Sequence, residues 1–415
     1  MMKNKKSDLS IQCDSEGRIL SLTNYTFTNF TEIHNELKNK RIFNLLHQNY
    51  VLQFINEFTL FLTSKQSFFE KKAVITLINT NFYTILSLEK RHDKIFITVK
   101  ITSAFDFLPK NKLAAFFFLT RFKFVLGSLI PFIFGTVWTI YKYYKISYQF
   151  FILTLLALIF LHIAANTFND YFDWISKRDL NNIDYVLSST GGSRAIDFKI
   201  ISEKHMYILS WICIFIVFII GIYMFLFVGY KILVLGLIGF FAVYFYSAPP
   251  IHLASRYGAG ELMHIFCLGP IITYGTVLVL SNNADIIDFI IGFPFGILIT
   301  CCLLMNEYPD ARSDKVSMKI NLVVVLTDKY LPSCFTLLLI LAFSELLLLI
   351  KLDQLPRVCY LILIILPYVY ITLKNVFLIK VSRNFASEAC LKSLNLYIYT
   401  SFLLIISILA AIIIR

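Results

Sequence analysis

The segment FILTLLALIFLHIAANTFNDYFDWISKRD, Phe151–Asp179, joins a long apolar run to an acidic end. About 20 predominantly apolar residues are needed for a helix to cross the hydrocarbon layer of a bilayer. This run ends in three aspartates, Asp170, Asp173 and Asp179. Ionised carboxylates are costly at membrane depth and usually face a water-filled cavity that serves an ion or a substrate. The segment therefore predicts a membrane-spanning helix that ends in a functional site.

The composition of the whole chain is typical of membrane proteins. Of its 415 residues, 58% are apolar and 15% are charged. The net charge of +12 does not indicate nucleic-acid binding, because the basic residues are scattered between apolar runs, as the positive-inside rule expects of loops. The Cys residues form no CxxC pair, so we expect neither a metal cluster nor a disulfide framework. We also expect no cleavable signal peptide, because the lysines of MMKNKKSDLS are followed by no apolar core.

Nine apolar runs predict nine transmembrane helices. The loops after the second, fourth, sixth and eighth runs hold most of the Lys and Arg, which places these loops and the N-terminus in the cytoplasm. We therefore expect an integral protein of the inner (cytoplasmic) membrane, with the acidic end of the second span on the cytoplasmic side. The predicted spans are Phe116–Tyr141, Phe150–Phe168, Tyr207–Val228, Ile232–Ala248, Leu262–Leu280, Ile286–Met305, Leu331–Ile350, Val358–Phe377 and Leu394–Ile414.

Residues 1–108 differ from the rest of the chain and predict a separate soluble domain. They are more polar and contain short segments with alternating apolar residues, which indicates an α+β fold. The order of these segments, with SEGRILSLTN near the start, resembles a PAS sensor domain. An accessory domain that only packs on the membrane part is the alternative. Residues 109–415 then form the membrane domain.

The acidic end of the second span carries its polar residues close together. Asp170 and Asp173 are three residues apart, and Asn166 and Asn169 each precede one of them by four residues. Side chains three or four residues apart are neighbours on a helix surface. These four side chains are therefore expected on one side of the helix.

A second cluster, NEYPDARSD, ends the sixth span. Asn306, Asp310 and Asp314 follow one another at spacings of four, again one helical face, although Pro309 is expected to distort its start. Carboxylate and amide oxygens suit Mg²⁺, which commonly binds through one or two carboxylates together with substrate phosphates. Solvated loop charges are the alternative, and an ion-coupled transporter would place such groups nearer the middle of the bilayer.

These motifs resemble those of the UbiA-type intramembrane prenyltransferase superfamily, especially its 1,4-dihydroxy-2-naphthoate polyprenyltransferase branch. NDYFD followed by Asp179 resembles the first Asp-rich motif, and NEYPDARSDKVSMKINLVVVL resembles the second. TGGSRAI, YFYSAPPIHLASRYGAGE and TRFKF also resemble stretches of that branch, so the likeness covers residues 113–415. The resemblance implies an all-α domain of nine helices around a central cavity that holds a polyprenyl diphosphate through two Mg²⁺ ions.

The resemblance also implies the residues that bind metal and carry out catalysis. Each motif would hold one Mg²⁺, and Asp170 would lie beside the first metal. The implied ligands are Asn169, Asp173 and Asp179 for one metal and Asn306, Asp310 and Asp314 for the other, and the implied catalytic carboxylates are Asp170, Asp173, Asp310 and Asp314.

Basic and aromatic residues complete the expected site. Arg121, Arg194 and Lys319 are expected to pair with diphosphate oxygens, with ordinary cytoplasmic loop charges as the alternative. Tyr246 is expected to line the acceptor pocket, with an ordinary interfacial tyrosine as the alternative. One departure from the branch is Met318, which replaces a usual Gly before Lys319.

The function implied is Mg²⁺-dependent transfer of a polyprenyl group to an aromatic quinone precursor. We expect the acceptor to be 1,4-dihydroxy-2-naphthoate, in menaquinone synthesis. The alternatives are 4-hydroxybenzoate, a tetrapyrrole or a lipid as acceptor. A membrane-anchored sensor without catalytic activity is the alternative from another class. The partners implied are the polyprenyl diphosphate, the aromatic acceptor and the lipid bilayer, and the sequence does not predict the oligomeric state.

Overall fold

The chain divides into two compact units, which are described separately. One consists mainly of Met1–Phe116, and the other of Phe117–Asn181 and Leu187–Arg415. The predicted domain boundary after residue 108 falls outside the described residues and stays a prediction. The computed structural model describes residues 9–14, 19–24, 68–77, 80–91, 94–101, 111–144, 146–178, 192–196, 200–379 and 385–415.

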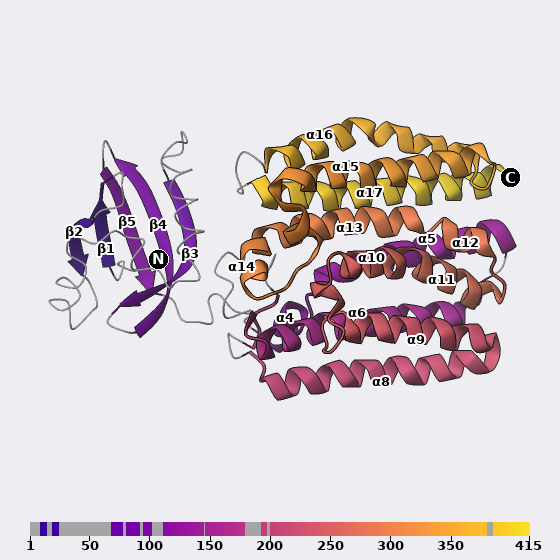
Figure 1. The fold of residues 1–415 in the computed structure, drawn as a ribbon, viewed down its shortest axis with the longest axis horizontal. Coiled ribbons are helices and arrows are strands. Elements are labelled where there is room, and N and C mark those ends of the chain that lie inside the picture. The colour runs from indigo at the N-terminus through magenta and orange to yellow at the C-terminus, as the bar shows by residue number, and fades with distance from the viewer. Residues whose placement is uncertain are drawn as a thin grey trace, which may run out of the picture. The chain divides into compact units, whose positions relative to one another are not determined.

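The N-terminal unit contains a five-stranded antiparallel sheet with the strand order β2-β1-β5-β4-β3 (Figure 1). Ile11 is paired with Ile97, which in turn is paired with Leu88, and all three side chains are buried. One face of the sheet is therefore apolar, which agrees with the predicted alternation. The PAS-like character stays a prediction. The strands are β1 Leu9–Cys13, β2 Ile19–Asn24, β3 Phe68–Leu77, β4 Thr80–Arg91 and β5 Lys94–Ile101.

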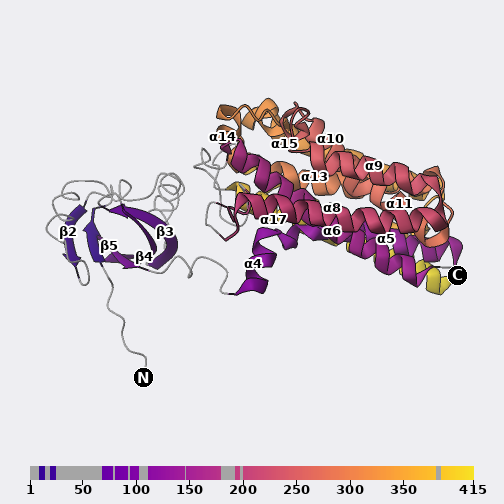
Figure 2. The ribbon, with the colours of Figure 1, turned by 90° about the horizontal axis from the view of Figure 1, so that it is seen from below.

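The second unit is helical, and its long helices lie side by side in an elongated bundle (Figures 1 and 2). In the described part of the chain, seven helices are long and apolar enough to cross a membrane. Each of the nine predicted spans overlaps a helix, but α5 and the 16-residue α9 are not among those seven, so the count of nine stays a prediction. The helices up to the middle of the chain are α4 Lys112–Leu119, η2 Phe122–Val125, α5 Leu126–Tyr143, α6 Tyr148–Ile175, α8 Glu203–Val228, α9 Tyr230–Phe245, η3 Leu253–Ser255 and α10 Ala259–Phe266.

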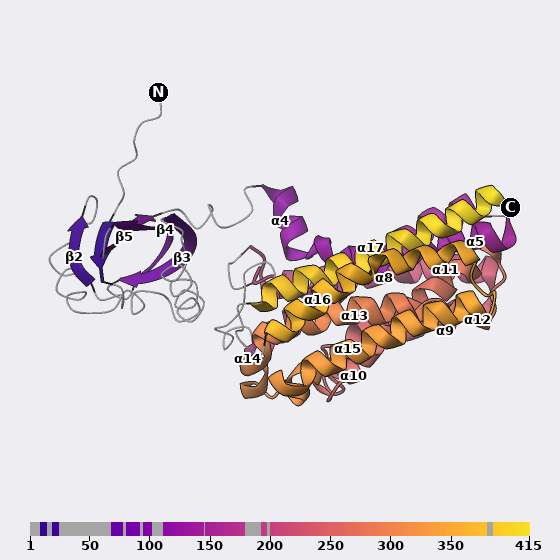
Figure 3. The same ribbon diagram turned by 90° about the horizontal axis from the view of Figure 1, so that it is seen from above.

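The remaining helices complete the bundle, with α14 at one end and α12 at the other (Figure 3). The π-helical segment η4 connects α10 to α11, and short 3₁₀ segments precede α14 and α16. These elements are η4 Cys267–Ile271, α11 Ile272–Ser281, α12 Ile286–Ile290, α13 Phe293–Glu307, η5 Tyr308–Asp310, α14 Ala311–Val316, α15 Leu322–Lys351, η6 Arg357–Ile365, α16 Leu366–Leu378 and α17 Phe385–Ile414.

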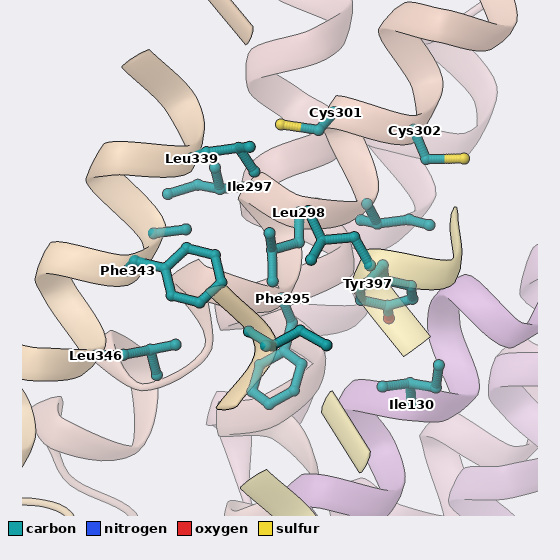
Figure 4. Packing of buried hydrophobic residues seen from close by; sticks show 14 of the residues in the cluster. Ile130, Phe295, Ile297, Leu298, Cys301, Cys302, Leu339, Phe343, Leu346 and Tyr397 are labelled. Atoms are coloured by element: carbon teal, nitrogen blue, oxygen red, sulfur yellow. The ribbon is translucent and has the colours of Figure 1, made fainter. Parts of the chain in front are cut away.

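Helix α13 forms the centre of the main apolar core (Figure 4). Its buried Phe295 and Leu298 belong to the same cluster as Phe343 of α15 and Tyr397 of α17. The Tyr397 hydroxyl donates to the Gly127 carbonyl of α5 at 3.1 Å, which satisfies its polar atom inside this core. Because α13 carries NEYPD at its end, this packing fixes the position of the second acidic motif.

Two glycines let the start of α13 approach α10 and η4 closely. A Cβ atom built on Gly296 would overlap the Ile265 carbonyl, and one built on Gly269 would overlap the Gly292 carbonyl. Glycine is the residue that allows such close backbone approach. The contact brings the chain around Glu261 on α10 next to the end of α13.

A buried polar network joins α5 to α12 at the end of the bundle where α12 lies. Asp288 is fully buried and accepts from Trp138 Nε1 at 2.7 Å and from Lys142 Nζ at 2.8 Å. Asp285 caps α12 and also accepts from Lys142 Nζ, at 2.7 Å. A buried carboxylate is tolerated only when it is paired and hydrogen-bonded, and these bonds satisfy that condition. This network therefore has a structural role.

Candidate active site

The first acidic motif lies in the last turns of α6, and both of its described aspartates are buried. The backbone N–H of Ser193 donates to both oxygens of Asp170 at 3.2 Å. Arg121 Nη1 lies 4.0 Å from Asp170 Oδ1. Asp170 therefore holds the Ser193 backbone and lies beside Arg121.

Asn169 connects this motif to the loop that follows α9. Its side-chain Nδ2 donates to Ser247 Oγ at 3.0 Å and to Asp173 Oδ2 at 3.3 Å. Its Oδ1 accepts from Arg121 Nη1 at 3.4 Å. Asp173 also accepts from Arg178 Nη1 at 3.3 Å. The amide of Asn169 therefore holds an arginine, a carboxylate and a loop hydroxyl in one arrangement.

The second motif is carried by three short elements rather than by the single helical face that we expected. Helix α13 ends at Glu307, and the 3₁₀ turn Tyr308–Asp310 leads into α14. Pro309 lies in this turn, where it has no N–H to continue the helix. Asp310 and Asp314 are nevertheless both buried, while Asn306 is half-buried.

Lys319 lies in the site, although Met318 replaces the glycine expected before it. Met318 has a φ of 59°, in the left-handed region that favours glycine. The Lys319 N–H donates to the Asp314 carbonyl at 2.8 Å, and Lys319 Nζ lies 3.5 Å from Asp314 Oδ2. Asn321 Nδ2 donates to the same Oδ2 at 3.0 Å. Met318 thus adopts the backbone of a glycine, so Lys319 still reaches the acidic motif.

The electrostatics show that the two motifs lie close to each other. The pKa of Asp314 is raised to about 7, because burial and the charges of Asp310 and Asp173 together outweigh the opposing effect of Lys319. Burial alone would lower the pKa of Lys319, but Asp314 and Asp173 raise it above its ordinary value, with smaller contributions from Glu307 and Tyr246. Asp173 belongs to the first motif, so both motifs act on Lys319.

Two loops are paired beside the site. Tyr257 N–H donates to the Ile320 carbonyl at 2.7 Å, and Arg256 forms a parallel bridge with Ile320. The Ala254 N–H donates to the Tyr246 carbonyl at 2.9 Å, which folds the loop back on the end of α9. The pairing fixes the loop carrying Tyr246 and Ser247 against the loop carrying Lys319.

Residues 128–412 match the UbiA prenyltransferase family. The chain belongs to this family. The match covers more than half of the chain and contains both acidic motifs, so the resemblance expected from the motifs is confirmed.

This UbiA-family chain is similar to a relative found by sequence and to several solved structures. The 1,4-dihydroxy-2-naphthoate octaprenyltransferase of Bacillus subtilis (strain 168) is 26% identical over 211 residues, which cover 51% of this chain and 65% of that relative. This chain therefore matches less than two thirds of the relative's length. Among solved structures, the apo UbiA homolog from Aeropyrum pernix K1 has a TM-score of 0.50, with 13% identity over 70% of this chain and 98% of that chain. A UbiA homolog from Archaeoglobus fulgidus bound to GPP and Mg²⁺ has a TM-score of 0.46, with 14% identity over 70% of this chain and 99% of that chain.

This UbiA-family protein is an integral membrane protein with a predominantly helical domain and a small N-terminal sheet. The fold expected from the sequence is confirmed in this form. The inner membrane as its location and the cytoplasmic side of the site stay predictions.

Most of the predicted site residues lie close together around Lys319 and the end of α6, and one lies outside the described residues. That residue is Asp179. Arg194 is almost completely buried and follows Ser193, whose N–H holds Asp170. Within the described ranges, no three His, Cys, Asp or Glu side chains are arranged to hold a metal ion. The residues brought together are Arg121, Asn169, Asp170, Asp173, Tyr246, Asp310, Asp314 and Lys319.

Sequence reasoning missed several side chains that shape the site. Ser193 and Ser247 lie inside the TGGSRAI and YFYSAPP stretches, so their position within shared motifs was the available signal. Asn321 and Glu261 had the same signal, because they lie inside the NEYPDARSDKVSMKINLVVVL and YFYSAPPIHLASRYGAGE stretches, whereas Arg178 lies outside NDYFD. Glu261 is buried on α10, and its Oε1 accepts from the Leu322 N–H at 2.7 Å.

Proposed function

We propose that this protein transfers a polyprenyl group from polyprenyl diphosphate to a hydroxylated aromatic acceptor, with Mg²⁺ as cofactor. One observation carries the proposal: two buried acidic motifs meet around Lys319 at the end of an apolar bundle, and Asp173 and Asp310 together raise the pKa of Asp314. Carboxylates placed so closely repel one another, and a bound cation offsets this repulsion.

The residues present fit Mg²⁺. The oxygens of Asn169 and Asp173 are proposed for one ion, and those of Asn306, Asp310 and Asp314 for the other, all of them hard ligands. Asp179 is proposed as a further ligand of the first ion. When bound, the metal neutralises negative charge on the leaving diphosphate.

The basic residues are proposed to bind the diphosphate. Lys319 supplies an ammonium group beside the second motif, and Arg121 supplies a guanidinium group beside the first. Arg194 is proposed as a third contact. Guanidinium groups can bind two oxygens of one phosphate, which orients the leaving group as well as attracting it.

The reaction proposed at this site balances without a redox partner. The allylic C–O bond breaks and its electron pair leaves with the diphosphate. A ring carbon of the acceptor forms the new C–C bond, and the ring then loses a proton and regains aromaticity. Tyr246, which acts electrostatically on Lys319, is proposed to stabilise the allylic cation through its ring.

The proposed acceptor is 1,4-dihydroxy-2-naphthoate, in menaquinone synthesis. The naphthoate octaprenyltransferase of Bacillus subtilis, 26% identical over 211 residues, supports this acceptor. A direct test compares turnover with the naphthoate to turnover with 4-hydroxybenzoate, a tetrapyrrole and a lipid alcohol.

A second proposal is that residues 1–108 form a sensor that regulates the membrane domain, with an accessory domain as the alternative. A deletion of these residues should leave turnover unchanged if the domain is only accessory. Ligand-dependent turnover that disappears on deletion would establish the regulatory role.

The test of the proposed function measures diphosphate release and prenylated product from purified protein supplied with polyprenyl diphosphate, Mg²⁺ and each acceptor. Asp173→Asn and Asp310→Asn should lower turnover at least ~1,000-fold, since each removes a charge that acts on the leaving group. Asp353→Asn is the matched control, because Asp353 lies on an exposed turn with Arg357 as partner. Equal turnover in all three variants would refute the metal assignment.

A further inference from the structure

A cavity of about 620 Å³ lies among α6, α8, α9, η4 and α11, and its wall is almost entirely apolar. Two of its polar lining residues, Thr154 and Thr276, donate their hydroxyls to backbone carbonyls of their own helices, at 2.7 Å each. Their hydrogen-bonding capacity is thus largely used within the protein.

His162 is the exception on this wall. It lines the cavity together with Ser128 of α5, and the distance between His162 Nδ1 and Ser128 Oγ is 2.6 Å. This bond fixes the ring and leaves Nε2, for which the described residues provide no hydrogen bond. Ionisable side chains within membrane spans are rare and usually mark a functional site.

The face of α6 that carries His162 continues into the first acidic motif. Asn169 follows His162 by seven residues, so in an ideal helix their side chains point in directions that differ by only about 20°. The two residues are separated by about 10 Å along the helix axis. Ala165 also lines the cavity, and it lies one turn before Asn169. The cavity wall and the proposed metal site therefore share one side of α6.

The chemistry of an imidazole selects the group that binds it. A hydrocarbon chain cannot satisfy Nε2, and an unpaired polar atom in a buried site costs about 1–3 kcal/mol. The diphosphate is expected about two helical turns away, beside the acidic residues. A ring hydroxyl can both donate and accept, so it satisfies Nε2 in either neutral tautomer of His162.

We propose that His162, held by Ser128, hydrogen-bonds a ring hydroxyl of the aromatic acceptor and orients the ring toward the metal site. This inference rests on the proposed function. It assigns an acceptor-binding residue in the middle of the membrane domain, outside both acidic motifs. The separation of about 10 Å along α6 leaves room for an aromatic ring between His162 and the reacting carbon of the prenyl group.

The chain provides a matched control in His264 of α10. Its Nδ1 lies 2.8 Å from Thr300 Oγ1, so it is bound to a hydroxyl as His162 is. In the described part of the chain, however, His264 is not among the residues that line this cavity. A His→Gln change can therefore be made once at a histidine that lines the cavity and once at a nearby histidine that does not line it.

The experiment measures KM for the acceptor and for the polyprenyl diphosphate in wild type, His162→Phe, His162→Gln and His264→Gln. The acceptor is compared with the analogue that has hydrogen in place of this hydroxyl, which can neither donate nor accept. His162→Phe should raise the acceptor KM about 10-fold and leave the diphosphate KM within about twofold. His162→Gln should retain part of the affinity, and His264→Gln should change neither constant.

The analogue without the hydroxyl provides the decisive comparison. Removing the hydroxyl should raise the acceptor KM in wild type and in His264→Gln but have little further effect in His162→Phe. If removing the hydroxyl costs the same in wild type and His162→Phe, or if both KM values rise together, the inference is wrong. If wild-type protein prenylates no hydroxylated aromatic, the proposed function itself is wrong. If wild type is active but His162→Phe leaves the acceptor KM unchanged, only this inference is wrong.

Discussion

Lys319 Nζ lies 3.5 Å from Asp314 Oδ2. The backbone between the two residues turns at Met318, whose φ of 59° lies in the left-handed region that favours glycine. This pair joins the two acidic motifs, because Asp173 of the first motif also acts on Lys319. The pair is therefore a sensitive place to test the site.

Replacing Lys319 should weaken binding of the diphosphate. Lys319→Met removes the ammonium group but keeps much of the apolar stem, so we expect the KM for polyprenyl diphosphate to rise at least ~10-fold. Lys319→Arg should retain part of the affinity. Steady-state kinetics at saturating Mg²⁺ checks this, and a KM unchanged in Lys319→Met would mean that Lys319 serves only to balance charge.

Replacing Met318 by glycine should stabilise the protein. A left-handed backbone costs an L-residue about 1–2 kcal/mol, while glycine loses about 0.5–1 kcal/mol in chain entropy. We expect Met318→Gly to raise the apparent Tm slightly and to preserve turnover. Met318→Ala is the control, since alanine bears the same backbone strain, and an equal Tm in both variants would argue against strain at this turn.

Asp314 should make the metal-free protein more stable at lower pH. Its folded pKa of about 7 lies above its ordinary value of 3.8, so the folded state binds the proton more tightly than the unfolded chain. The resulting stabilisation is fully present below about pH 4 and is lost as the pH rises toward 7. Thermal unfolding in a chelator between pH 5 and 8 measures it. Asp314→Asn should flatten this dependence, and an identical slope in both proteins would contradict the shift.

Protonation of Asp314 should weaken the binding of Mg²⁺. Below about pH 7 a proton competes with Mg²⁺ for Asp314, so the Mg²⁺ concentration for half-maximal activity should rise as the pH falls. Activity at several Mg²⁺ concentrations checks this, and a Mg²⁺ requirement that does not change with pH would exclude Asp314 as a ligand.

Gly296→Ala should destabilise the bundle because the added Cβ would overlap the Ile265 carbonyl. Overpacking of this kind costs about 1–3 kcal/mol, and here the obstacle is backbone. The matched control is Gly221→Ala on α8, where nothing lies within 4 Å of the added Cβ. That change should be neutral or stabilising, because alanine is the better helix former by about 1 kcal/mol. Thermal unfolding should therefore show a lower apparent Tm for Gly296→Ala and an unchanged or higher one for Gly221→Ala.

Trp138→Phe should weaken the end of the bundle away from α14 without changing the chemistry. It removes the 2.7 Å hydrogen bond to the buried Asp288, and a bond to a charged group contributes about 1.5–3 kcal/mol. The apparent Tm should fall, while the KM values of the folded protein stay the same. Tyr360→Phe at an exposed tyrosine is the control. Altered KM values in Trp138→Phe would show that this network also shapes the site.

Local patterns determined the elements of this protein. The segment Phe151–Asp179 predicted a spanning helix with an acidic end, and α6 runs from Tyr148 to Ile175 with Asp170 and Asp173 buried in its last turns. Apolar runs and the spacing of polar residues are properties of neighbouring residues, so one sequence is enough to show them. The pairing of NDYFD with NEYPD as one site followed from their shared residue types.

Only the tertiary structure decided the partners of these residues. Asn169 bonds Ser247, which lies 78 residues further on, and Asp170 bonds Ser193, 23 residues away. Such contacts depend on how α6, α9 and the loops pack, and no local pattern encodes that packing. The structure also shows that the second motif is divided at Pro309 between α13, a 3₁₀ turn and α14 instead of lying on one helix. It further shows that His162 lines a cavity. Sequence thus determined which residues lie at the helix ends and within the spans, whereas packing determined which of them meet.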